Sequence, residues 1–96
     1  MAEEEIILVE TYCSYYKVEP SFIETLETYG LLSISYRENQ RFILVEEISS
    51  LEKFSRMYYE LHINVPGIDA LHHMLDKIKD LQQEAETLRS RLRIYE

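Results

Sequence analysis

The stretch from Lys17 to Leu32, KVEPSFIETLETYGLL, constrains the fold more than any other, because it contains a helix start, an apolar stripe and a helix stop. A helix can begin at Pro20, since the first helical N–H needs no partner. Gly30 tolerates the left-handed conformation that commonly ends a helix. We therefore expect a helix bounded by these two residues. Its apolar stripe is Phe22, Ile23, Leu26 and Tyr29.

A similar stripe precedes this stretch and predicts a first helix from about Val9 to Lys17. Val18 then forms a buried pivot, so the two segments together indicate a helix-turn-helix. Cys13 lies on the inner face of the first helix, where an unpaired cysteine packs like a small hydrophobe. Before this helix, Ile6–Leu8 is compatible with a short strand or with the helix entry. The stripe of the first helix is Val9, Tyr12, Cys13 and Tyr16.

The period of the apolar residues changes to two after the second helix, which predicts a β-hairpin. We expect its turn to contain Glu38, Asn39 and Gln40, with Asn39 the residue most able to take a positive φ. A hairpin directly after a helix-turn-helix is a wing. The first strand sets Leu32, Ile34 and Tyr36 against polar neighbours, and the second sets Phe42 and Leu44 against Arg41 and Ile43.

Helical spacing returns from about Glu46 to His62 and predicts a third helix. Asn64, Pro66 and Gly67 then break the chain, and Pro66 makes the residue before it a poor helical residue. The apolar positions of the third helix are Ile48, Leu51, Phe54, Tyr58 and Leu61.

The last segment has an unbroken heptad pattern, which predicts a coiled-coil helix from about Ile68 to Tyr95. At 1.5 Å per residue it would be about 40 Å long, longer than the preceding domain is wide. We expect its stripe to pair with a second copy in a homodimer; folding back on its own domain is the alternative. Contacts of Glu84 with Arg89 and of Arg91 with Glu96 would favour a parallel pair, and the direction stays open. The dimerisation residues are Leu71, Met74, Ile78, Leu81, Ala85, Leu88, Leu92 and Tyr95.

These segments give a mainly α fold with a small β-hairpin wing: a winged helix-turn-helix over residues 1–66 and a coiled-coil dimerisation helix over residues 67–96. No apolar run reaches the roughly 18 residues needed to span a membrane. The N-terminal MAEEEIILV has no basic region before its apolar stretch, so we expect no signal peptide. A single cysteine cannot build a disulfide framework, which favours a reducing cytoplasm.

Charge is distributed unevenly along the chain. Residues 1–30 hold seven Glu, including the acidic lead Glu3–Glu5, against Lys17 alone, a net charge of −6 out of −8 for the whole chain. DNA binding draws much of its affinity from Lys and Arg on phosphates. The outward positions of the second helix are acidic or neutral, which argues against DNA as a partner. These positions are Glu19, Ser21, Glu24, Thr25, Glu27 and Thr28.

Side chains that could carry chemistry are few. Only two glycines are present and no Ser or Cys lies beside a base, so we expect no enzyme and no cofactor. One helix face places carboxylates and imidazoles at metal-ligand spacing, with His62 as a further ligand. Surface pairing at i, i+4 is the preferred interpretation, and we expect no metal. The four residues of that face are Asp69, His72, His73 and Asp76.

The order of these landmarks resembles the MerR-type fold, and in particular its small offshoot, the chaperone-modulator (CbpM) family of bacteria. The resemblance rests on VEPSFIETLETYGLL, on Arg41 and Phe42 in the wing, on INVPGIDALHHML and on the terminal heptads. DNA-binding MerR proteins carry an R-x-L-R-Y-Y pattern at the start of the second helix, and this chain lacks its basic and aromatic members. Arg41 is either a remnant of DNA contact or an ordinary wing residue.

The resemblance implies a protein that binds the J-domain of a DnaJ-like co-chaperone and inhibits its stimulation of Hsp70. The alternative is a MerR-like transcriptional regulator that binds DNA. J-domains present a basic helix to Hsp70, and an acidic surface would complement it. By spacing, Tyr12, Tyr29, Tyr36 and Tyr58 are expected in the core and Tyr59 on the surface. The expected partner-binding residues are Tyr15, Glu19, Glu24 and Glu27.

Overall fold

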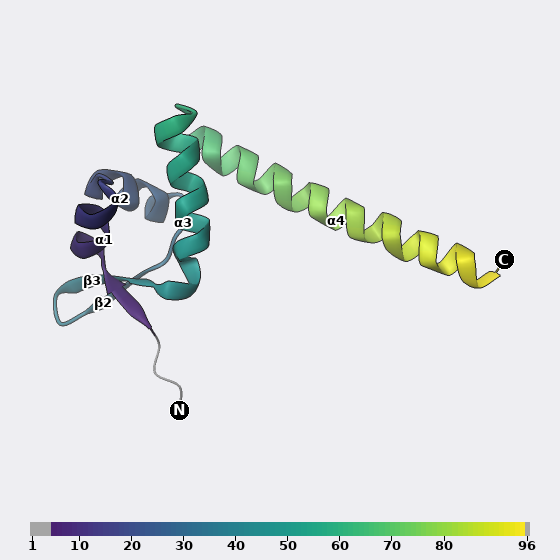
Figure 1. Cartoon of the computed structure of the whole chain (residues 1–96), viewed down its shortest axis with the longest axis horizontal. Helices are drawn as coiled ribbons and strands as arrows, with labels where there is room; N and C mark the ends of the chain where they lie inside the picture. Colours follow the sequence, from purple (N-terminus) through teal and green to yellow (C-terminus); the bar gives the residue numbers. More distant parts are fainter. Residues whose placement is uncertain (1–4, 96) are drawn as a thin grey trace.

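The computed structural model describes residues 5–95, without the side chain of Tyr95. A small domain lies at one end of the molecule, and the last helix extends away from it (Figure 1). The principal extents are 60 × 41 × 21 Å. The acidic lead at Glu3 and Glu4, and Glu96 with its expected contact, lie outside the described residues. The elements are β1 (Ile6–Leu8), α1 (Val9–Tyr16), α2 (Pro20–Thr28), β2 (Ile34–Arg37), β3 (Gln40–Leu44), η1 (Val45–Glu47), α3 (Ile48–Ser55), η2 (Arg56–Glu60) and α4 (Val65–Tyr95).

The helix-turn-helix is formed as the sequence predicts. α1 ends where Lys17 adopts a left-handed conformation with φ 56°, and the backbone N–H of Val18 donates to the Cys13 carbonyl at 3.0 Å. α2 begins at Pro20, and Gly30 has φ 74° just beyond its end. The N–H of Leu31 donates to the Leu26 carbonyl at 2.9 Å, which caps the helix and turns the chain back.

The sheet has three antiparallel strands in the order β1-β3-β2. Ile6–Leu8 is therefore a strand, which decides between the two interpretations left open above. Glu38 and Asn39 have φ values of 50° and 64°, and Arg37 pairs with Gln40. The turn thus has two central residues, both with positive φ, as in the tight turns that match the strand twist. The sequence identified Asn39 correctly, but Gln40 belongs to β3.

Because the turn has two residues and not three, the alternation of inward and outward side chains along β3 is shifted by one residue from the prediction. Ile34 pairs with Ile43, and Ile43 also pairs with Ile7, so a row of three isoleucines crosses the sheet. Ile43 is fully buried and the other two pack against the core. The predicted grouping of Phe42 and Leu44 as the main apolar face of this strand is wrong, because a one-residue shift moves every side chain to the opposite face.

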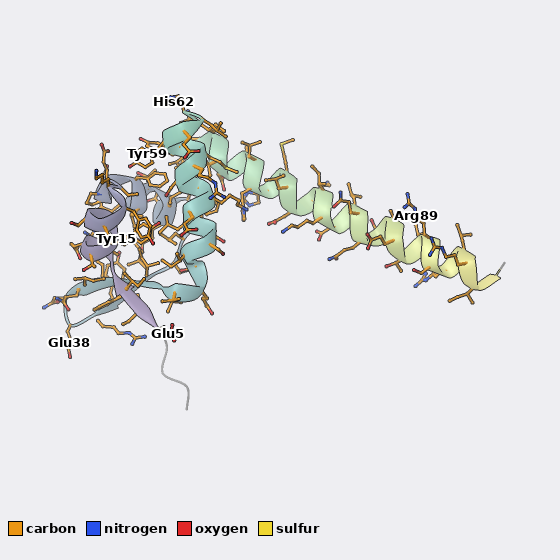
Figure 2. All side chains as sticks on the ribbon, in the orientation of Figure 1. Glu5, Tyr15, Glu38, Tyr59, His62 and Arg89 are labelled. Atoms are coloured by element: carbon orange, nitrogen blue, oxygen red, sulfur yellow. The ribbon has the colours of Figure 1, made fainter. Side chains whose placement is uncertain are left out.

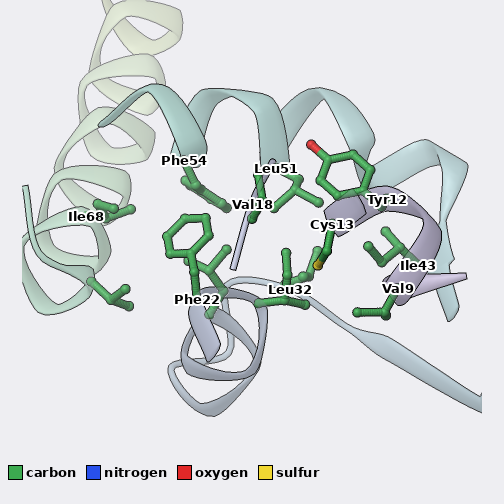
Figure 3. Close-up of a cluster of buried hydrophobic side chains, with 13 residues drawn as sticks. Val9, Tyr12, Cys13, Val18, Phe22, Leu32, Ile43, Leu51, Phe54 and Ile68 are labelled. Carbon is green, nitrogen blue, oxygen red and sulfur yellow. The ribbon is translucent and has the colours of Figure 1, made fainter. Parts of the chain in front are cut away.

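The core gathers residues from α1, α2, α3 and α4. In Figure 3, Ile68 and Phe54 lie at one end of the cluster and Val9 and Ile43 at the other. Cys13 is buried among them, as expected. The full set of buried residues is Val9, Tyr12, Cys13, Val18, Phe22, Ile23, Leu26, Leu32, Ile43, Leu51, Phe54, Val65 and Ile68.

The third predicted helix is not uniform. It comprises a 3₁₀ turn (η1), an α-helix (α3) and a π-helical turn (η2), and His62 with φ 56° ends it. A π turn contains more residues than an α turn, so the positions after it rotate out of the apolar stripe. Leu61, predicted in that stripe, is 65% exposed for this reason, whereas Leu51 and Phe54 are buried.

Helix α4 starts at Val65 rather than at Ile68. The Asn64 side-chain oxygen accepts a hydrogen bond from the Gly67 N–H at 2.8 Å, an N-cap that satisfies a free donor of the first turn. Pro66 lies in that first turn, where a proline is tolerated. With 31 residues, α4 is about 46 Å long. Among residues 5–95, no helix is both long and apolar enough to cross a membrane.

Candidate partner-binding surface

The outward face of α2 is engaged with the wing. Glu24 and Glu27, two of the expected partner-binding residues, both contact side chains of the hairpin. Two hydroxyls of the same face bond back to the helix: Thr25 donates to the Ser21 carbonyl at 2.8 Å, and Thr28 to the Glu24 carbonyl at 3.0 Å. Most polar groups that the sequence placed on a free surface therefore have partners within the chain.

Arg41 joins three elements. Its guanidinium donates from Nη1 to Glu24 Oε1 on α2 at 2.7 Å and from Nη2 to Glu10 Oε1 on α1 at 2.8 Å. The hydrogen bond from Arg41 lowers the pKa of Glu10 below its usual 4.5. The hydrogen bonds with Glu10 and Glu24 raise the pKa of the Arg41 guanidinium. With 26% of its side chain exposed and its charge neutralised by two carboxylates, Arg41 is a connector between the wing and both helices.

Tyr36 is the second link between wing and α2. Its hydroxyl donates to the Glu27 carboxylate, with O–O distances of 2.9 and 3.1 Å, and this bond raises the pKa of the phenol. Tyr36 is opposite Arg41 in the sheet, so both side chains reach the same carboxylate-bearing helix. The predicted core position of Tyr36 is wrong, because its ring is 62% exposed. Tyr29, also predicted in the core, is exposed, whereas Tyr12 is buried and Tyr58 packs against the core as expected.

The other two expected contact residues lie on the α1 side of the domain. Tyr15 is 78% exposed, and its ring meets that of Tyr16 edge to face at 4.9 Å between centroids. The side chain of Glu19 is exposed, and its backbone N–H donates to the Tyr59 hydroxyl at 3.0 Å. Figure 2 labels Tyr15 and Tyr59, which come from α1 and η2. Glu24 and Glu27 thus hold side chains of the wing, whereas the side chains of Tyr15 and Glu19 form no hydrogen bond or ion pair within the described residues.

Helix α4 leaves its heptad stripe largely uncovered. Beyond its first turns, where Val65 and Ile68 are buried, the helix projects from the domain with side chains around its whole circumference (Figure 2). Leu71 is half-buried next to the domain. The side chain of Tyr95 is outside the described residues. The exposed large apolar members of the stripe are Met74, Ile78, Leu81, Leu88 and Leu92.

The histidine-rich face of α4 forms the i, i+4 pairs that the sequence favoured. His73 Nδ1 lies 3.3 Å from Asp69 Oδ1, and His72 Nε2 lies 3.6 Å from Asp76 Oδ2. The His72 ring also packs edge to face on Phe54 at 5.4 Å, which holds the start of α4 against α3. Within residues 5–95, no group of three or more His, Cys, Asp or Glu is arranged to hold a metal ion.

Sequence reasoning missed Glu10 and the role of Tyr36. The Glu10–Arg41 contact spans 31 residues of sequence and the Tyr36–Glu27 contact spans nine, so no local period contains either of them. Both contacts depend on the length of the hairpin turn, which the sequence did not determine. With a two-residue turn, the face of β3 that carries Ile43 and Arg41 is the one directed toward the helices.

Comparison with known proteins agrees with this architecture. The sequence profile of the MerR HTH family regulatory proteins matches residues 7–90. The matched range runs from β1 through the helix-turn-helix and the wing into the projecting part of α4. Neither the curated proteins nor the solved structures that were searched gave a match. The chain therefore belongs to the MerR family of helix-turn-helix regulatory proteins.

Proposed function

We propose that this chain is a non-enzymatic modulator that binds the J-domain of a DnaJ-like co-chaperone and inhibits its stimulation of Hsp70, as its resemblance to the chaperone-modulator (CbpM) family implies. The observation that carries the proposal is the neutralised wing. Arg41, the cation in the position of a DNA contact, is held by Glu10 and Glu24 at 2.8 and 2.7 Å. A MerR-type fold whose wing Arg41 is already paired with two carboxylates is better suited to a protein partner than to phosphates.

The charge of the domain also supports a basic partner. Seven Glu against Lys17 in residues 1–30 give the helix-turn-helix an acidic field. Such a field attracts a basic helix and speeds its encounter with the domain. Exposed aromatic rings, Tyr15 and Tyr16, supply contact area at a low entropic cost.

The projecting helix supports a homodimer. Its apolar stripe is exposed over most of about 46 Å, far more than the first turns of α4 bury against their own domain. We infer that two copies pair along this stripe, which would present two binding domains to the solvent. Pairing would bury an apolar surface that isolated soluble proteins seldom expose.

Two measurements test the modulator function. The J-domain of a DnaJ-like co-chaperone from the same organism is immobilised, and binding of the chain is followed by surface plasmon resonance. We expect saturable binding that weakens as salt rises, because surface attraction is screened within about 8 Å at physiological ionic strength. In parallel, the chain should reduce J-domain-stimulated ATP hydrolysis by Hsp70 and leave the basal rate unchanged. No binding at tens of micromolar would overturn the proposal.

DNA binding is the second candidate, and the family match with residues 7–90 is the observation that favours it. A regulator of this kind would contact the grooves of DNA with α2 and the wing. For that role Arg41 would have to exchange its two carboxylates for phosphates. A sequence-specific gel shift at nanomolar protein near physiological salt would establish this function in place of the first.

A further inference from the structure

A groove lies between the end of α1 and the segment formed by α3 and η2, apart from the α2 surface. Its volume is about 490 Å³, enough for one or two large side chains. One wall is aromatic: Tyr12 and Tyr16, one turn apart on α1, stack with ring centroids 4.6 Å apart. Tyr16 is 49% exposed, so the upper part of this wall is open to solvent. The groove therefore offers apolar ring surface that a partner side chain can cover.

Tyr59, a residue of η2, also lines the groove, and contacts within the domain already fix its position. Its hydroxyl accepts the hydrogen bond from the Glu19 N–H at 3.0 Å, and its ring packs edge to face on Phe22 at 5.5 Å. A ring held at both ends loses little further freedom when it is covered. Such preorganisation lowers the entropic cost of binding.

The opposite wall carries a row of charges. Glu52, Arg56 and Glu60 follow one another at intervals of four residues along α3 and η2, and all three side chains are exposed. Within the described part of the chain they form no ion pair, unlike Glu10 and Glu24. The row thus presents a negative, positive, negative sequence of unengaged charges. Its two carboxylates are separated by eight residues, about 12 Å along a helix.

We propose that this groove, and not the outward face of α2, is the docking site for an amphipathic helix of the partner. The matching helix has two basic residues about two turns apart for Glu52 and Glu60, with an acid or amide between them for Arg56. An apolar side chain or the stem of an arginine covers the exposed part of the Tyr16 ring, which stacks on the buried ring of Tyr12. Lys17, at the end of α1, also lines the groove and excludes a uniformly basic segment, which fixes the register of the helix.

This inference rests on the proposed function, because the partner helix is taken to belong to a J-domain. The test titrates unlabelled J-domain into the ¹⁵N-labelled full chain and follows amide shifts. Two groove variants, Tyr16→Ala and the pair Glu52→Lys with Glu60→Lys, are measured beside it. The matched control is Asp80→Lys with Glu86→Lys on α4, which makes the same change in net charge far from the groove.

We expect shifts concentrated at the end of α1 and along η2. The groove charge reversal should weaken J-domain binding roughly tenfold or more, and the α4 control should change it less than about threefold through long-range attraction alone. Tyr16→Ala should weaken binding with little change in salt dependence, because it removes contact area and no charge.

Three results would count against the inference, and they are distinguishable. Shifts confined to α2 and the wing, with wild-type affinity in the groove variants, would overturn the groove and leave the proposed function intact. Equal losses in the groove and control pairs would show general charge attraction, and would also overturn the groove. A wild-type chain that shows neither shifts nor binding would overturn both proposals. Unchanged amide dispersion in the charge-reversed pair shows that a loss of binding is not a loss of fold.

Discussion

The guanidinium of Arg41 donates to the carboxylate of Glu24 across 2.7 Å, and this contact ties the wing to the second helix of the helix-turn-helix. The same guanidinium holds Glu10 on the first helix. The arginine that would face the backbone of DNA in a DNA-binding wing thus pairs with carboxylates of its own domain. The acidic face of α2 is, for the same reason, less available than its sequence suggests.

Removing this connector should destabilise the domain in a pH-dependent way. Arg41→Gln is expected to lower Tm by a few degrees at pH 7, since it leaves two carboxylates without their partner. The pKa of Glu10 is lowered in the folded state, so its contribution is present above the usual value of 4.5 and is lost as pH falls through the folded value. The difference in Tm between variant and wild type should therefore shrink between about pH 5 and pH 3.

Thermal melts across this pH range, followed by circular dichroism, provide the measurement. Arg93→Gln on the exposed part of α4 is the matched control, and it should leave Tm unchanged at every pH. A difference in Tm between Arg41→Gln and wild type that stays constant down to pH 3 would show that carboxylate pairing is not the cause of the destabilisation.

Self-association should depend on the heptad stripe of α4. Replacing Leu81 and Leu88 by Asp places charges in the pairing surface, where an ion without a partner is costly. Sedimentation equilibrium should show a dimer for the wild type and a monomer for this variant. Gln83→Asp with Ser90→Asp, on the opposite face of the helix, should remain dimeric. A wild-type chain that is monomeric at tens of micromolar would remove the coiled-coil interpretation.

DNA binding should be weak at physiological salt. Gel shifts with random genomic fragments near 150 mM salt should show no complex below micromolar protein, because a protein gains such affinity by placing several cations on phosphates. Glu10→Gln with Glu24→Gln frees Arg41 and removes two negative charges, so this variant should bind DNA measurably more tightly at low salt. Equal binding by the two proteins would show that the neutralised arginine does not limit DNA affinity.

The start of α4 should depend on its N-cap. Asn64→Ala removes the acceptor of the Gly67 N–H and should cost about 1 kcal/mol of unfolding free energy. Asn64→Asp keeps an acceptor at this position and should be close to wild type. Urea denaturation of both variants gives the comparison; an alanine variant as stable as the aspartate variant would contradict a capping role.

The helix-turn-helix could be predicted because its signals are local. Pro20, Gly30 and the apolar stripe between them define α2 within one short stretch. The structure places them as expected except for Tyr29, which is exposed just beyond the end of the helix. The heptads of α4 are equally local, although the cap at Asn64 makes the helix begin before the proline that suggested a break.

The hairpin shows why the rest could not be predicted. Whether its turn has two or three residues depends on Gln40, whose side chain favours neither possibility. One residue decides whether Phe42 or Ile43 faces the core, and with it whether Arg41 can reach the helices. The contacts of the candidate surface follow from that register, so the periodicity of the sequence alone could not predict them. The exposed Leu61 has a similar cause in the π turn before it.

Four residues, Leu61 to Asn64, join η2 to α4, and a small change in their backbone angles moves the far end of α4 a long way. Helix α4 is continuous, and it packs against the domain through its first turns, chiefly with Val65 and Ile68. A rotation of only 10° at this joint would displace the far end of a 46 Å arm by about 8 Å. The backbone angles of Leu61 to Asn64 therefore set how far apart, and at what inclination, two copies joined along their arms would hold their domains.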